Sequence, residues 1–218
     1  MKKGYYFILE GTEYCGKDAQ CELLEKALLK LGNDVVVTRE PGGTPEAEKI
    51  RDILKNPNLK HNFLADICLF EAARSYVVSD FILPAIAQGK IVLSKRSHYS
   101  TDIYQGYLDE FVTDENRAEV LYLISTFNRI ALAGLKPSGA YILDLTVEEV
   151  FRRRASTDRS ADRFDDKDRS IHEKLIEGYR RLKLIYPNEI EIINSERPRE
   201  IVHQEILQKV LKIIERDK

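Results

Sequence analysis

Cysteine is scarce in this sequence, and net charge is nearly absent. The 218 residues include three cysteines (Cys15, Cys21 and Cys68) and carry a formal net charge of −2. An odd number of cysteines without metal-ligand spacing predicts neither a disulfide framework nor a zinc site, so a reducing cytoplasm is expected. A nearly neutral charge balance gives no global attraction to nucleic acid or to an anionic membrane, and neither partner is expected.

Long apolar runs are also missing. The first apolar segment, residues 5–9, is ended by Glu10 and is too short for the core of a signal peptide. No run approaches the roughly 20 apolar residues of a membrane span. No linker or low-complexity tract interrupts the chain, so we expect one domain over residues 1–218.

Strand-like and helix-like patterns alternate along the chain. Short apolar runs predict strands at 5–9, 35–38, 90–94, 141–145 and 189–193. Helical periods predict helices at 19–31, 46–54, 63–86 with a kink or break at Pro84, 115–133, 147–154, 170–185 and 199–215. Alternation of this kind is typical of an α/β fold with a five-stranded parallel sheet covered by helices on both faces. Ligands of such sheets bind beyond the carboxyl ends of the strands.

The segment from Gly11 to Asp18 has the form of a phosphate-binding P-loop. It follows the first predicted strand and opens the first long helix, which is the context that the motif requires. Two glycines let backbone N–H groups point at phosphate oxygens, and Lys17 can reach the outer phosphates. Asp18, however, stands where such loops carry the Ser or Thr whose hydroxyl ligates Mg²⁺. The alternative is a glycine turn before an ordinary helix.

Further blocks resemble those of thymidylate kinases. Residues 38–44 read TREPGGT, residues 69–74 read LFEAAR, and Arg96 is followed at the family's spacing by YQG at 104–106. Pro137, the LDL of 143–145 and the DRFD of 162–165 continue the resemblance to about residue 195. It implies the P-loop fold of nucleoside monophosphate kinases and ATP-dependent phosphorylation of dTMP to dTDP. It also implies a homodimer.

The resemblance assigns a role to most of the marked residues. Lys17 would hold the β- and γ-phosphates of ATP. Arg51 and Arg96 would clamp the phosphate of the nucleoside monophosphate with their planar guanidinium groups. Phe70 would stack on the thymine ring, and Arg74 would donate to its edge. From the residues alone, the alternatives are a core phenylalanine on an apolar helix face and solvated arginines.

The sugar of the acceptor nucleotide would meet a further group. Tyr104 would fill the space that a ribose 2′-hydroxyl needs, Gln105 would help to orient the base, and Glu13 would contact the 3′-hydroxyl. The residues implied for ATP are Gly11, Thr12, Glu13, Tyr14, Cys15, Gly16, Lys17, Asp18 and Ala19. Those implied for the acceptor nucleotide are Glu13, Glu40, Arg51, Phe70, Arg74, Arg96, Ser100, Tyr104 and Gln105.

Residues 152–169 are rich in arginine and match the position of the family's lid, which closes over the ATP phosphates. An arginine delivered by a closing loop stabilises the charge that develops on a transferring phosphoryl group. Some family members carry that arginine in the P-loop, where Tyr14 stands here, and others carry it in the lid. The catalytic residues beside Lys17 and Arg96 would then include Arg159 or Arg163. The alternative is a solvated lid whose charges keep it open.

Several positions depart from the family's pattern. Asp18 replaces the metal-binding hydroxyl and Lys95 replaces an aspartate, while Ser97, Tyr76 and Ser138 replace a tyrosine, a glutamine and an aspartate. An unpaired carboxylate about 4 Å from a phosphate charge would cost about 4 kcal/mol at an effective dielectric near 20. Asp18 therefore needs a cation, which is either Mg²⁺ bound directly or Lys95. We expect an ion pair between Asp18 and Lys95.

These departures leave two alternatives to thymidylate kinase activity. One is a nucleotide-binding protein of kinase fold with weak or lost catalysis. The other is a kinase for a different deoxynucleoside monophosphate, with Tyr76 reshaping the base pocket.

Overall fold

A computed structural model describes residues 2–156 and 168–217. Within these ranges five parallel strands form one sheet in the order β2-β3-β1-β4-β5. The strands are β1 (Tyr5–Glu10), β2 (Val35–Arg39), β3 (Ile91–Lys95), β4 (Gly139–Asp144) and β5 (Ile190–Asn194). Each lies within two residues of its predicted bounds, and the predicted α/β fold is confirmed.

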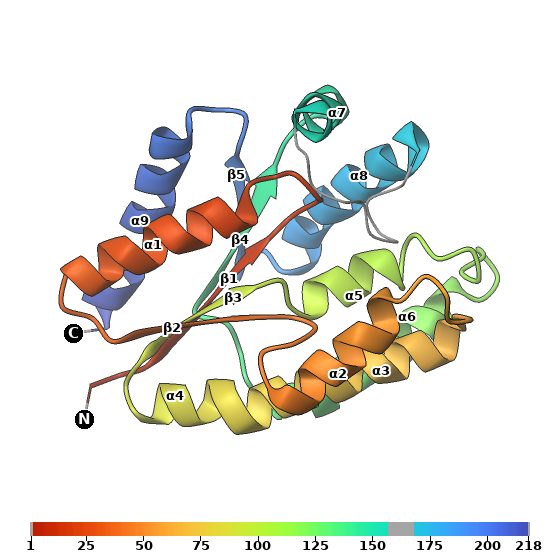
Figure 1. Cartoon of the computed structure of the whole chain (residues 1–218), viewed down its shortest axis with the longest axis horizontal. Helices are drawn as coiled ribbons and strands as arrows, with labels where there is room; N and C mark the ends of the chain where they lie inside the picture. The colour runs from red at the N-terminus through yellow and green to blue at the C-terminus, as the bar shows by residue number, and fades with distance from the viewer. Residues whose placement is uncertain (1, 157–167, 218) are drawn as a thin grey trace.

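Helices cover both faces of this sheet (Figure 1). On one face lie α1 (Lys17–Lys30) and α9 (Arg199–Arg216), and on the other lie α5 (His98–Tyr104) and α8 (Arg169–Ile185). Because side chains alternate along a strand, Phe7 of β1 packs in the first core and Ile8 in the second. The uniformly apolar strands of a parallel sheet therefore serve two cores at once.

The long helix predicted over 63–86 is one continuous helical rod that contains a π-helical turn. It comprises α3 (Phe63–Val77), the π-helical segment η1 (Val78–Ile82) and α4 (Leu83–Ala87). Pro84 lies in the first turn of α4. A proline ring clashes with the carbonyl four residues earlier, and a π turn just before it relieves that clash. The structure thus has a π turn just before Pro84, and the helical rod does not break there.

The remaining helices are α2 (Pro45–Lys55), α6 (Arg117–Ala131) and α7 (Val147–Ala155). Helix α2 begins behind Thr44, whose side chain accepts a hydrogen bond from Ala47 N. Helix α5 was not predicted, because seven residues are too few to show a helical period; Ser97 caps it by accepting from Tyr99 N. Within the described ranges, no helix combines the length and the apolar character needed to cross a membrane.

Candidate active site

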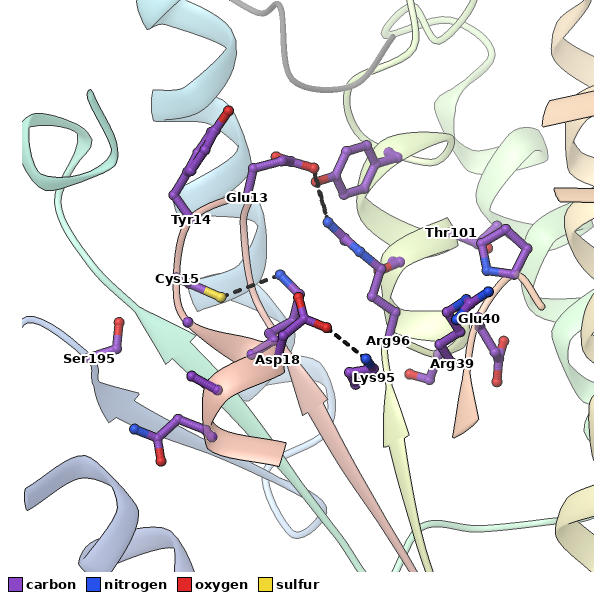
Figure 2. Close-up of a pocket in the computed structure, with 18 of the residues that line it drawn as sticks. Glu13, Tyr14, Cys15, Asp18, Arg39, Glu40, Lys95, Arg96, Thr101 and Ser195 are labelled. Atoms are coloured by element: carbon purple, nitrogen blue, oxygen red, sulfur yellow. Dashed lines mark hydrogen bonds and ion pairs between the residues drawn. The ribbon is translucent and has the colours of Figure 1, made fainter. Parts of the chain in front are cut away.

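A cavity of about 820 Å³ lies beyond the carboxyl ends of the central strands (Figure 2). The P-loop and the start of α1 line one part of it, and residues of the TREPGGT, LFEAAR and YQG blocks line the rest. Every predicted site residue within the described ranges lines the cavity except Gly11 and Thr12. Segments far apart in the sequence thus meet in one space.

Two glycines shape the P-loop. Gly11 has a φ of 134°, and a Cβ there would lie 2.7 Å from the carbonyl oxygen of Leu143. Gly16 has a φ of 94° and is the N-cap of α1. Only glycine adopts such backbone angles without strain, so the loop can turn tightly into the helix. The N–H groups of the first turn of α1 therefore face the cavity, where an anion is favoured.

Lys17 bends back over this loop. Its Nζ donates to Gly11 O at 2.8 Å and to Thr12 O at 2.6 Å, and it lies 3.3 Å from Cys15 Sγ. An ammonium has three donors, and all three are used by the loop itself. The ammonium is thereby fixed at the mouth of the P-loop.

Arg96 lies at the junction between the P-loop and the part of the cavity that the TREPGGT, LFEAAR and YQG blocks line. It follows β3 with a φ of 70°, a left-handed conformation that is uncommon outside glycine and clusters at functional sites. Its Nη2 donates to Glu13 Oε1 at 2.9 Å, and Tyr104 donates to the same oxygen at 2.6 Å. Burial raises the pKa of Glu13, but the charges of Arg96 and Lys17 and the hydrogen bond from Tyr104 outweigh it and hold that pKa below its usual range.

Tyr179 of α8 is a site residue that the sequence did not reveal. Its hydroxyl accepts from Arg96 Nη1 at 3.2 Å and donates to Glu10 Oε2 at 3.1 Å. Glu10, fully buried at the end of β1, also accepts from Ser97 N and Ser100 Oγ. A tyrosine on the buried face of an amphipathic helix is normally a core residue, so its periodicity carried no sign of this role.

Arg74 is almost fully buried, with 2% of its surface exposed. Four of its five N–H groups donate within the described part of the chain, to Glu40, Glu71, Thr101 and Asn128. Burial raises the pKa of Glu40 to about 7, against the opposing charge of Arg74. Asn128, which the sequence analysis did not single out, fixes one edge of the guanidinium and bonds Asp102 as well.

Asp18 and Lys95 form the expected ion pair. Lys95 Nζ donates to Asp18 Oδ1 at 2.7 Å, beside the mouth of the P-loop (Figure 2). The side chain of Asp18 is 72% exposed and that of Lys95 is 27% exposed, so the pair lies at the solvent side of the cavity. The prediction of this contact is confirmed.

Comparison with known proteins identifies the family. A model described as thymidylate kinase matches residues 9–206. The thymidylate kinase of Thermoanaerobacter sp. (strain X514) is 36% identical over 212 residues, covering 97% of this chain and all of that protein. That of Caldanaerobacter subterraneus subsp. tengcongensis is 34% identical over 208 residues, covering 95% of each. The chain belongs to the thymidylate kinase family.

The fold agrees with this family at the level of the whole chain. A crystal structure of thymidylate kinase from Ehrlichia chaffeensis superposes with a TM-score of 0.73 at 26% identity. The match covers 95% of this chain and 99% of that one. The cavity described above is therefore that of a thymidylate kinase fold.

For this thymidylate kinase family member, the residues do not fit a divalent cation held by the protein. Within the described residues there is no group of three or more His, Cys, Asp or Glu side chains that could hold a metal. Asp18, which alone replaces the usual P-loop hydroxyl, has an ammonium 2.7 Å from its Oδ1. Glu13, the next carboxylate in the loop, bonds Arg96 and Tyr104. A metal ion at Asp18 would be repelled by the ammonium already there.

The predicted lid arginines Arg159 and Arg163 lie outside the described residues. Arg153, at the end of α7, lies inside them and lines the cavity. Its Nη1 donates to Tyr14 O at 3.2 Å and its Nη2 to Ser195 O at 2.7 Å. An arginine that bonds the P-loop backbone was present in the charged run of the sequence but was not distinguished from its neighbours there.

One expectation about the base pocket is wrong. Tyr76 does not line the cavity, and 41% of its surface is exposed. Residues two apart on a helix point to nearly opposite sides, so Tyr76 turns away from the side on which Arg74 meets the cavity. Tyr76 cannot reshape the base pocket by contact, and the argument for a different deoxynucleotide loses its basis.

Proposed function

We propose that the protein transfers the γ-phosphoryl group of ATP to dTMP, giving ADP and dTDP. A phosphate oxygen of dTMP would attack the γ-phosphorus while the bond from that phosphorus to the β,γ-bridging oxygen breaks. The observation that carries this proposal is the single cavity that joins the P-loop lysine to Arg51 and Arg96. Such an arrangement supports transfer between two phosphates, because catalysis of this reaction is mainly positioning and charge stabilisation.

The donor side would use the P-loop. We assign the β- and γ-phosphates to Lys17 and to the N–H groups of residues 13–19, which line the cavity. Lys17 would exchange its bonds to Gly11 O and Thr12 O for bonds to phosphate oxygens, since both are acceptors for the same ammonium. Magnesium bound to ATP would be carried by the nucleotide's own phosphates.

The acceptor side would use Arg51, Arg96 and Phe70. Arg51 Nη1 donates to Pro41 O at 2.8 Å, which directs the guanidinium along the cavity wall. Arg96 is held in place by Glu13, Ser100 and Tyr179, and it would bind a phosphate by exchanging some of these hydrogen bonds for phosphate oxygens. Four N–H groups of Arg74 bond described residues, and the fifth would donate to the edge of the base. Phe70 would stack on the ring of the base.

A second candidate function is nucleotide binding with weak or lost catalysis. The ion pair between Asp18 and Lys95 favours it, because a cation is already present where P-loop kinases place their metal. A coupled assay separates the two. We expect ATP turnover with dTMP to exceed that with dUMP, dCMP, dAMP or dGMP, and to fall at least a hundredfold in Lys17→Met.

Turnover as fast with another acceptor as with dTMP would contradict the substrate assignment. Absence of turnover with all five acceptors, together with calorimetric binding of ATP and dTMP, would leave the binding function in its place. Repeating each reaction in EDTA and in excess Mg²⁺ would show how far the metal contributes.

We further propose that the whole chain acts as one kinase unit in the cytoplasm, where ATP is abundant, and that it forms a homodimer. Helices α3 and α6 lie side by side and expose large apolar side chains, notably Leu64 at 51% and Tyr122 at 74% (Figure 1). Exposed apolar groups on neighbouring helices are typical of a helix-packed interface. Light scattering should give a dimer mass, and Tyr122→Glu should shift it toward the monomer.

A further inference from the structure

The ammonium of Lys95 lies beside the P-loop, next to Asp18. Lys95 is the last residue of β3, and the parallel pairing of β1 with β3 places it opposite Leu9, two residues before the loop begins. Arg96 N donates to Leu9 O at 3.0 Å and continues that pairing. The strand register thus places the backbone of Lys95 beside the P-loop, and from there its side chain reaches Asp18 at the start of α1.

The charges around the loop differ from those of an ordinary P-loop. There, a neutral hydroxyl and a carboxylate from a neighbouring segment leave one negative charge that a metal ion offsets. Here, Asp18 and Lys95 sum to zero, and the charge of Glu13 is balanced by Arg96. Lys17 offsets the charge of Glu10, which directly precedes the loop and accepts a hydrogen bond from Gly11 N. The loop therefore has no surplus of negative charge for a divalent cation to neutralise.

The two kinds of cation also have different requirements. Mg²⁺ requires nearly octahedral oxygen ligands at about 2.0–2.1 Å. An ammonium needs only acceptors at hydrogen-bond distance, and it has three donors of which Asp18 takes one. The carboxylate of Asp18 holds this ammonium at the helix N-terminus, where phosphate oxygens are also favoured.

We propose that the Lys95 ammonium, held in place by Asp18, supplies at this P-loop the positive charge that a protein-bound divalent cation supplies elsewhere. The loop then binds the triphosphate of ATP almost equally well with and without Mg²⁺. This inference rests on the proposed function only through ATP, and it does not depend on which nucleotide accepts the phosphate.

The test measures binding rather than turnover. A non-hydrolysable β,γ-methylene analogue of ATP is titrated calorimetrically into the full chain, once in EDTA and once in excess Mg²⁺. The quantity compared is the ratio of the dissociation constant in EDTA to that in Mg²⁺. We expect a ratio below about threefold for the unmodified protein, and a larger ratio would overturn the proposal.

Substitutions then assign the effect to the pair. Lys95→Met leaves the Asp18 carboxylate facing the phosphates, so the ratio should rise at least tenfold. Asp18→Asn keeps the ammonium, and its ratio should stay low. Asp18→Thr combined with Lys95→Asp restores a hydroxyl and a carboxylate, and its ratio should be high. Its effect should differ from the sum of the effects of Asp18→Thr alone and Lys95→Asp alone. Additive effects, or an unchanged ratio in Lys95→Met, would overturn the pairing.

Lys90→Met is the matched control. Lys90 directly precedes β3, at the amino end of the strand, whereas Lys95 lies at its carboxyl end. The side chain of Lys90 is 29% exposed, and its Nζ lies 4.0 Å from Asp34 Oδ2. This variant removes the same charge and should leave the ratio unchanged. The coupled assay with the five acceptors stands apart: failure of turnover would refute the kinase function while the binding ratio still decides this inference.

Discussion

Tyr104 donates a 2.6 Å hydrogen bond to Oε1 of Glu13, and Arg96 donates to the same oxygen. One carboxylate of the P-loop thus holds both the Tyr104 ring and the Arg96 guanidinium, which line the same cavity. Glu13 therefore connects the P-loop to the side of the cavity that we propose for the acceptor nucleotide. Such a shared acceptor fixes both partners more firmly than separate contacts to solvent would.

The first prediction concerns the sugar. We expect dTMP to bind more tightly than UMP or AMP, and at least tenfold more tightly than ribothymidine 5′-monophosphate, which differs from it only by the 2′-hydroxyl. The Tyr104 ring excludes that hydroxyl, so Tyr104→Phe should keep the preference and Tyr104→Ala should lose it. Calorimetric dissociation constants measure the effect. Equal affinity of the two thymine nucleotides for the unmodified protein would refute it.

The second prediction concerns the base. Phe70→Ala should weaken dTMP binding by about 1–3 kcal/mol, the range for loss of one aromatic ring stacked on a base. Tyr76→Ala, on the same helix but outside the cavity lining, is the control and should leave the affinity unchanged. The same titrations decide between the two residues. An unaltered affinity for dTMP in Phe70→Ala would show that this side chain is a core residue and does not stack on the base.

The third prediction concerns Tyr179 as a positioning residue. Tyr179→Phe removes the hydroxyl that bonds Arg96 and Glu10, so the KM for dTMP should rise about tenfold, as expected for one hydrogen bond to a charged group. Affinity for the ATP analogue should not change. Tyr186→Phe, which removes a hydroxyl bonded to Asp102 instead, should leave the KM for dTMP as it is. Similar changes in both variants, or a loss of analogue binding, would indicate a merely structural role.

The fourth prediction concerns stability and pH. Glu40 is buried against Arg74, with Glu71 and Glu10 also facing it, and its pKa is raised to about 7. The folded state therefore keeps a proton that the unfolded state releases near pH 4.5, so this contribution is present at low pH and is lost as the pH rises toward 7.

Glu40→Gln lacks that titration. The stability of the unmodified protein minus that of Glu40→Gln should fall by on the order of 2 kcal/mol between pH 4.5 and pH 8. Urea unfolding at several pH values measures this difference. The buried His98, whose pKa is lowered to about 3 mainly by burial, is common to both proteins and cancels. A difference that stays constant with pH would contradict the assignment.

Much of the fold was predictable because its signals are local. Runs such as Ile91-Val92-Leu93 behind Gly89 mark buried strands within a few residues, and the glycines of the P-loop mark a turn that other residues cannot make. The helix α5 was missed because its start depends on one serine cap and its length is below two turns.

The site was predictable only in part. The pairing of Asp18 with Lys95 followed from charge, because a carboxylate beside phosphates needs a cation. The enclosure of Arg74 did not follow, since its partners Glu40, Thr101 and Asn128 lie 34, 27 and 54 residues away. Contacts of Tyr179 are likewise set by how α8 packs on the sheet. Such contacts exist only in the tertiary structure, and no spacing in the chain encodes them.

The π turn at Val78–Ile82 determines how the side chains of α3 are oriented around the helix axis relative to those of α4. A π turn is equivalent to one extra residue in an α-helix, and each residue advances a helix by about 100°. The extra residue lets Val77, Val78 and Ile82 stay against the sheet while Phe70 and Arg74, upstream of it, line the cavity. The wide turn takes up that residue locally, so deleting the exposed Ser79 would leave a regular helix whose two ends keep their orientation, with Phe70 and Arg74 still at the cavity. The same deletion within α3, between Arg74 and the π turn, would instead rotate Phe70 and Arg74 by about 100° away from the cavity, because a regular helix has no wide turn to absorb it.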